Sequence, residues 1–133
     1  YKQADFAQAI NTVFAVQGCF FFGRIETFSG IGAFDSRTFL YHEENILAEK
    51  IRDAGLSNVV LRDFWIQHNH GDKDKELQKR SKKLFHLRCM YESRCLYLKE
   101  YSGYGRFLSQ VLMLIWKIDF AVKKSLIRLF YQD

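Results

Sequence analysis

Short blocks of apolar residues divide the first half of the chain, and each block predicts one element. The densest block, residues 13–22, is rich in β-branched and aromatic side chains and predicts a buried strand. Residues 41–54 carry apolar side chains at helical spacing, and Gly55 follows where a C-terminal cap is expected. Smaller blocks predict a short helix within 3–12, a helical turn over 25–29, and extended segments over 58–61 and 64–67.

The second half of the chain predicts two long helices. An apolar pattern at helical spacing runs over 84–101, breaks at 102–105 and resumes over 107–131. The longest apolar run there, 111–116, is far shorter than the roughly 20 residues that cross a bilayer, so we expect a helix that lies on a surface. Five side chains of the second helix fall within about 20° of one line: Arg106, Gln110, Lys117, Lys124 and Arg128.

Charge is distributed unevenly between the two halves. Residues 1–71 contain 6 Lys and Arg against 8 Asp and Glu, whereas residues 72–133 contain 14 against 7. Anionic lipid and nucleic acid are the two partners that such a basic segment suggests. We expect aromatic side chains to pack on the face opposite the basic line, which favours peripheral membrane contact through residues 107–131 and no nucleic-acid partner.

Two adjacent carboxylates, Glu43 and Glu44, stand where the helix over 41–54 begins. The helix dipole stabilises acids at this position, so one interpretation is that they only cap the helix. The aromatic residues just before them are expected to be buried, which would turn the acids toward the edge of a cleft. A carboxylate placed there can take a proton from a sugar hydroxyl.

His68 and His70 are the other candidate site residues. They are two positions apart, so in an extended segment both rings point to the same side. Together with a carboxylate from elsewhere they could bind a divalent metal ion. A structural or solvent-facing pair fits the same spacing.

Several separated blocks of the sequence together resemble the second half of a family 2 glycosyltransferase. The resemblance covers about residues 15–71, and the Glu43-Glu44 variant looks like bacterial rhamnosyl- or galactosyltransferase relatives that build surface polysaccharides. The matching blocks are, in order, residues 18–24, Phe28, Ile31-Gly32, Phe34-Asp35, residues 39–44, Ala54-Gly55 and His68.

The resemblance implies an α/β fold. Residues 1–75 would be the acceptor-side, C-terminal half of a GT-A domain, in which helices flank a mostly parallel sheet. Residues 76–133 would follow as a basic, amphipathic, α-helical tail. The nucleotide-binding half of the family, with its Asp-x-Asp metal motif, has no counterpart in this sequence. We therefore expect a fragment that binds nucleotide-sugar poorly by itself.

The resemblance also implies roles for the two acids. The family motif usually reads Glu-Asp where this chain has Glu43-Glu44, so Glu44 occupies the position of the catalytic base. It would deprotonate an acceptor hydroxyl, whose oxygen would attack the anomeric carbon of the donor and invert its configuration. Glu43 would be the second catalytic acid.

Binding roles follow from the same comparison. Asp35, Tyr41 and His42 would shape the acceptor pocket, and His68 matches a family position near the donor diphosphate and metal. His70 is a second metal candidate from its spacing to His68 alone. The complete enzyme would use Mg or Mn, a nucleotide-sugar donor and a glycan or lipid-linked acceptor. It would be cytoplasmic and peripheral at the inner face of the cell membrane. The alternative hypothesis is a non-enzymatic basic module that docks on a membrane surface or on a protein.

Overall fold

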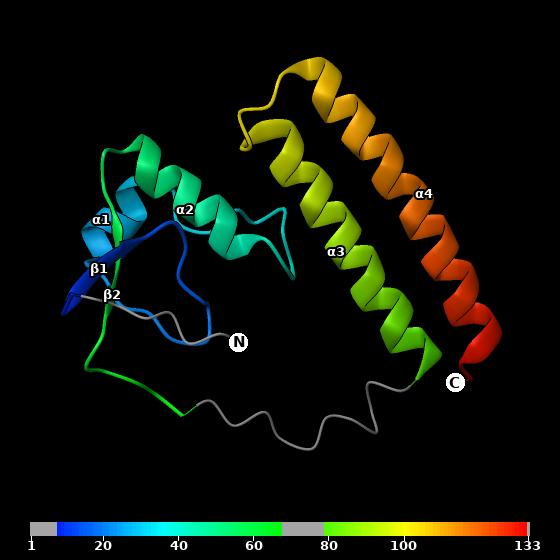
Figure 1. The fold of residues 1–133 in the computed structure, drawn as a ribbon, viewed down its shortest axis with the longest axis horizontal. Helices are drawn as coiled ribbons and strands as arrows, with labels where there is room; N and C mark the ends of the chain where they lie inside the picture. Colours follow the sequence, from blue (N-terminus) through cyan, green and yellow to red (C-terminus); the bar gives the residue numbers. More distant parts are fainter. Residues whose placement is uncertain (1–7, 68–78, 133) are drawn as a thin grey trace. The chain divides into compact units, whose positions relative to one another are not determined.

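The computed structural model of the chain describes residues 8–67 and 79–132, which divide into two compact units (Figure 1). The first unit takes residues 8–34 and 44–67. The second takes the segment Asp35–Glu43 together with residues 79–132. The predicted boundary between residues 75 and 76 lies outside the described residues and stays a prediction.

The first unit combines a small sheet with two helices. Strand β1 (Ile10–Val13) pairs antiparallel with β2 (Asn58–Leu61), so that Ile10 lies opposite Leu61. Helix α1 spans Ile25–Gly30, and α2 spans Glu43–Asp53 with its first residue in the second unit. The core comes from the buried residues Ile46, Leu47 and Ala48 of α2. Lys50 of α2 donates to the carbonyl oxygens of Gly32 and Ala33 at 3.1 and 2.9 Å, which fixes the turn after α1.

The second unit is built on a helical hairpin, α3 (Arg80–Glu100) and α4 (Arg106–Phe130). Figure 1 shows the two helices running side by side in opposite directions. Tyr91 stacks on Phe120 with 4.7 Å between ring centroids, and the Arg94 guanidinium lies 4.9 Å from the Trp116 ring. Among the described helices, none is both long enough and apolar enough to cross a bilayer.

Most of the predicted helices are confirmed. The structure has helices where the sequence predicted them over 25–29, 41–54, 84–101 and 107–131, and β2 coincides with the predicted segment 58–61. Gly55 follows α2 with φ of 72°, as expected for a residue that ends a helix in the left-handed conformation.

Two predictions in the first unit are wrong. The predicted strand over 13–22 is irregular after Val13, and residues 10–12, predicted to be helical, belong to β1. A buried strand needs hydrogen-bonded neighbours, but the single partner in the described chain, β2, is only 4 residues long. The aromatic residues of this segment therefore remain exposed, with Phe22 82% accessible. The sheet is also antiparallel, whereas the resemblance implies a mostly parallel sheet. The assignment of this unit to a GT-A half therefore stays a prediction.

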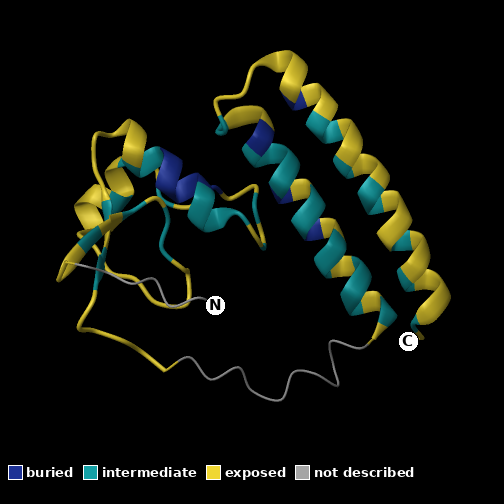
Figure 2. Ribbon diagram, viewed as in Figure 1, coloured by how far each residue is buried: buried dark blue, intermediate teal, exposed yellow. Residues whose placement is uncertain are grey.

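We expect the contact between α3 and α4 to carry much of the stability of the second unit. Figure 2 shows the buried positions of this unit mainly on α3. Leu98 is only 2% exposed, so Leu98→Ala should lower the free energy of unfolding by about 2–5 kcal/mol in chemical denaturation. Leu129→Ala is the control, because Leu129 is 75% exposed and should change stability by less than about 0.5 kcal/mol. Equal losses in the two variants would contradict this assignment.

Candidate functional site

Four predicted site residues lie in one segment, Asp35–Glu43, which packs along α3 within the second unit. They are Asp35, Tyr41, His42 and Glu43. Glu44, the predicted base, is the next residue but belongs to the first unit.

Asp35 anchors the start of the segment. Its side chain is nearly buried and accepts hydrogen bonds from Arg37 Nε at 2.9 Å and Arg37 Nη2 at 2.6 Å, one to each oxygen. Tyr101 at the end of α3 donates to Asp35 Oδ2 at 2.6 Å. Arg37 also pairs with Glu100 of α3, with 2.7 Å between Nη1 and Oε2. Both oxygens of Asp35 are thus engaged within the protein, so the structure gives Asp35 an anchoring role.

The protonation of Asp35 reflects these contacts. The hydrogen bonds from Arg37 hold the pKa of the Asp35 carboxyl well below its usual range, although burial opposes them, and Tyr101 lowers it further. Burial is the main cause that raises the pKa of Tyr101, and the Asp35 charge adds to it. The carboxylate and the phenol are therefore held as an ionised acceptor and a neutral donor.

The backbone just before the two acids is strained. Tyr41 and His42 have φ of 69° and 64°, in the left-handed region that side chains with a Cβ rarely adopt. Such a residue costs on the order of 1–3 kcal/mol and persists only where its surroundings determine its conformation. Contacts from the rest of the protein must therefore hold Tyr41 and His42 in this conformation.

Helix α3 supplies the contacts that hold the strained pair. His86, Ser93 and Tyr97 are seven and four residues apart, so they share one face of α3. The contacts are a 2.8 Å hydrogen bond from Ser93 Oγ to the Leu40 carbonyl oxygen, a 2.9 Å hydrogen bond between Tyr41 Oη and His86 Nδ1, and the His42 ring stacked 5.5 Å from that of Tyr97. Three consecutive residues are thus fixed by one face of a helix.

Glu43 has a buried carboxylate oxygen, Oε2, to which none of the described residues donates a hydrogen bond. Such an atom is rare in native proteins and indicates a place where a donor is expected. Glu43 also affects Tyr41, whose pKa is raised first by burial and then by electrostatic interactions with Cys89 and Glu43.

Glu44 is fixed by one oxygen only. Its Oε1 accepts a 3.0 Å hydrogen bond from the backbone N–H of Gly18. A Cβ at position 18 would lie 2.6 Å from Glu44 Oε1, so a larger residue there would make the end of the Glu44 side chain shift. In the part of the chain that the structure describes, no group donates to Oε2, and the side chain is half-buried. One oxygen is positioned while the other can accept a proton.

The metal site cannot be built from the described residues. His68 and His70 both lie outside residues 8–67 and 79–132. Within those ranges, no three His, Cys, Asp or Glu side chains come together in a way that fits a metal ion. The cation that the resemblance implies is therefore assigned to no described residue.

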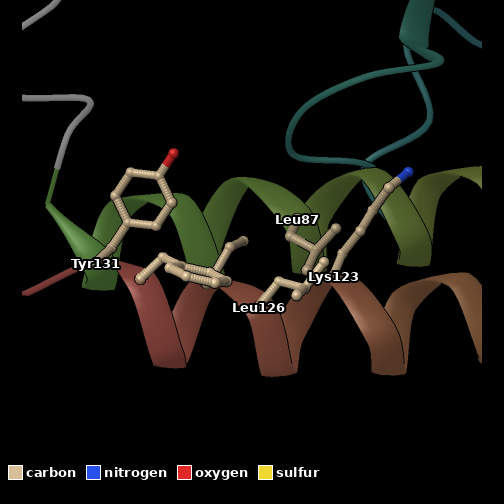
Figure 3. A pocket seen from close by; sticks show the side chains of 6 residues that line it. Leu87, Lys123, Leu126 and Tyr131 are labelled. Atoms are coloured by element: carbon tan, nitrogen blue, oxygen red, sulfur yellow. The ribbon is translucent and has the colours of Figure 1, made fainter.

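Two cavities lie elsewhere, along the α3–α4 hairpin. The larger, of about 360 Å³, is shown in Figure 3 near the end of α4. The smaller has a volume of about 260 Å³. Neither is lined by a predicted site residue. The larger cavity is lined by Leu87, Lys123, Leu126, Ile127, Phe130 and Tyr131.

Comparison of the chain with protein-family models, with curated proteins and with solved structures finds no match of any of the three kinds. The resemblance to family 2 glycosyltransferases therefore stays a prediction from the sequence. What the structure adds is the geometry of the segment that carries much of that resemblance.

Sequence analysis did not find the α3 residues that hold this segment. His86, Ser93, Tyr97 and Tyr101 follow one another at intervals of seven, four and four residues, which is the one signal in the sequence. Nothing in that spacing says that the partner is a segment 45 or more residues earlier. The contacts could be identified only from the folded chain.

The contact between Tyr101 and Asp35 can be tested by removing one oxygen atom. Tyr101→Phe keeps the ring but leaves Asp35 without one donor. Since a hydrogen bond to a charged group contributes about 1.5–3 kcal/mol, we expect the unfolding free energy at neutral pH to fall by that amount in urea denaturation. The control is Tyr104→Phe, an exposed tyrosine in the α3–α4 connection, which should change little. Equal effects of the two variants would contradict the role of Tyr101.

The lowered pKa of Asp35 predicts a pH dependence of stability. An Asp carboxyl in an unfolded chain titrates near pH ~3.9, and the folded value is lower, so the contribution of Asp35 is complete above that pH and lost as pH falls through the folded pKa. The stability difference between the wild type and Asp35→Asn should therefore be largest at neutral pH and shrink below about pH 4. Denaturation series from pH 7 to acid measure it. The exposed Asp63, changed to Asn, should give a small and nearly constant difference; a constant difference for Asp35→Asn as well would contradict the assignment.

Proposed function

We propose that the chain is the acceptor-side part of an inverting glycosyltransferase in which Glu44 acts as the catalytic base. The observation that carries this proposal is the strained pair Tyr41-His42 directly before the acids, held by α3. Backbone strain that is maintained by specific contacts is concentrated at functional sites. Here it sets the backbone direction at Glu43, the last residue of the segment.

The chemistry assigned to Glu44 fits its two oxygens. Oε1 is fixed by Gly18, and Oε2 would take the proton of an acceptor hydroxyl. The hydroxyl oxygen would form a bond to the anomeric carbon of the donor. The bond from that carbon to the nucleoside diphosphate would break, the leaving oxygen would keep the electron pair, and the configuration would be inverted.

Glu43 supports the same reaction in a different way. Its Oε2 is buried and has no donor from a described residue, so a donor from a part of the enzyme outside the described residues would complete it. Tyr41 and His42 would border the acceptor. Asp35 holds the start of the segment in place through its hydrogen bonds with Arg37 and Tyr101.

The donor-binding part is proposed to be a further, separate portion of the enzyme. Support comes from the first unit, where large apolar side chains are exposed that a larger GT-A sheet would cover: Phe20, Phe22, Phe64 and Trp65. The nucleotide-sugar would bind to this separate donor-binding part. The use of Mg or Mn stays a prediction for the complete enzyme.

We place this activity in bacterial surface polysaccharide synthesis, at the inner face of the cell membrane, with a glycan or lipid-linked acceptor. The second candidate function is a non-enzymatic module that docks on a membrane surface. One observation favours it, namely that α4 exposes a series of large apolar side chains. The two functions are compatible, because a peripheral enzyme also needs a membrane contact.

Replacing Glu44 tests the proposed base. In the whole open reading frame that contains residues 1–133, Glu44→Gln keeps the hydrogen bond from Gly18 but cannot take a proton. We expect the rate of sugar transfer to fall by about 10²–10⁴ with donor affinity nearly unchanged. Radiolabelled transfer assays and donor titration measure the two quantities.

The matched control is Glu26→Gln, which makes the same change at an exposed acid in the first turn of α1. It should transfer sugar at the wild-type rate. If Glu44→Gln also keeps full activity, Glu44 is not the base. If the whole reading frame transfers sugar from no nucleotide donor, the proposed function itself is wrong.

A further inference from the structure

Helix α4 has two apolar sides, and only one of them packs on α3. The other side, which we call the outer face, consists of residues that are all exposed, including Phe107 at 80% and Leu114 at 60%. At 100° per residue its members lie within about 40° of one line. Figure 2 shows most of α4 as exposed. The outer face consists of Phe107, Val111, Leu114, Ile118, Val122 and Leu129.

The extent of the outer face indicates that something covers it. From Phe107 to Leu129 it runs along about 33 Å of helix, at 1.5 Å per residue. Single exposed apolar side chains are normal on a protein surface, but a continuous series of this length marks an interaction site. The charges beside it identify the kind of partner.

One edge of the outer face is positively charged. Arg106, Lys117 and Arg128 are 11 residues apart, or about three helical turns, so they form a line along this edge. None of the three has a carboxylate of the described chain within ion-pair distance. The one acid of α4, Asp119, pairs with Lys123 at 2.8 Å and lies about 160° around the helix from this line.

We propose that the outer face of α4 lies in the surface of an anionic lipid bilayer, with the helix axis parallel to the membrane. The apolar side chains would enter the boundary between headgroups and acyl chains, and the cations of the edge would bind anionic headgroups. The long Lys and Arg side chains can reach headgroups while their aliphatic parts stay on apolar surface. Because no described helix is suited to crossing the bilayer, the contact is an interfacial one.

The charges disfavour an antiparallel pair of α4 helices, from two copies of the chain, as the partner arrangement. If two α4 helices met antiparallel through their outer faces, symmetry would put both basic edges on the same side of the pair. The two lines of Arg106, Lys117 and Arg128 would then repel each other. An anionic membrane satisfies the same cations. This proposal does not depend on glycosyl transfer, because its test measures binding and not activity.

The test is sedimentation of the full chain with vesicles of phosphatidylcholine alone or mixed with phosphatidylglycerol. We expect binding to the mixed vesicles that weakens strongly when salt rises from about 0.1 M to about 1 M. The triple variant Arg106→Gln, Lys117→Gln, Arg128→Gln should bind about a hundredfold more weakly, since each cation near an anionic surface contributes about fivefold. The charge-matched control changes three exposed cations elsewhere, Arg24, Lys79 and Lys99, to Gln and should lose much less.

Two further variants test the apolar part. Leu114→Asp with Ile118→Asp should lower vesicle binding by about tenfold or more, while circular dichroism shows that the helices remain, because both side chains are exposed. Leu114→Trp provides a probe that does not depend on loss of binding. Its fluorescence should shift to the blue on the mixed vesicles, whereas that of Lys99→Trp, on the exposed surface of α3, should not.

Three outcomes would overturn the proposal. Equal binding to neutral and anionic vesicles, unaffected by salt, would remove the role of the basic edge. Absence of vesicle binding together with a dimer that Leu114→Asp dissociates in analytical ultracentrifugation would assign the outer face to a second copy. Absence of vesicle binding by a monomer would show that the outer face is not a lipid-binding surface.

Discussion

The packing of Asp35–Glu43 against α3 is the contact on which the rest of the candidate site depends. It uses three kinds of interaction in one stretch: the ionic cluster of Asp35 with Arg37 and Tyr101, the hydrogen bonds to Leu40 and Tyr41, and the stacking of His42 on Tyr97. Each contact by itself is modest. Together they hold a backbone conformation that an isolated peptide would leave, and so they fix where α2 begins.

The two acids at the start of α2 share a position in the sequence but not an environment. Glu43 has an oxygen that is buried and lacks a donor, whereas Glu44 is tied by one oxygen to Gly18 and has the other unengaged by described residues. Adjacent carboxylates in distinct surroundings can take different parts in one reaction, one orienting a substrate and one moving a proton. The membrane contact inferred for α4 concerns a separate surface, and either conclusion can fail without the other.

Periodicity predicted the long elements because each of α2, α3 and α4 repeats apolar residues at helical spacing. The prediction failed over 13–22, where the apolar composition indicated a strand. In the described chain this segment has no neighbouring strand after Val13. The contacts of α3 could not be predicted, because one side of this helix packs on α4 and another on Asp35–Glu43, which leaves no single apolar stripe. For α4 the aromatic side chains were expected to pack, and this holds for Trp116 and Phe120 but not for Phe107, which is exposed. Sequence can show that a helix has two apolar sides; only the fold shows which one is covered.

The segment Asp35–Glu43 lies far in sequence from the residues that hold it. This separation affects the order in which the contacts form during synthesis. Tyr41 and Asp35 leave the ribosome 45 and 66 residues ahead of the α3 side chains that bind them. Contacts of such high sequence separation form late, because a long loop must first close. During synthesis α2 can form early, but Glu43 at its start reaches its final backbone direction only after α3 has emerged. Until the second half is translated, the nascent chain carries the segment Asp35–Glu43 without the contacts that hold its conformation.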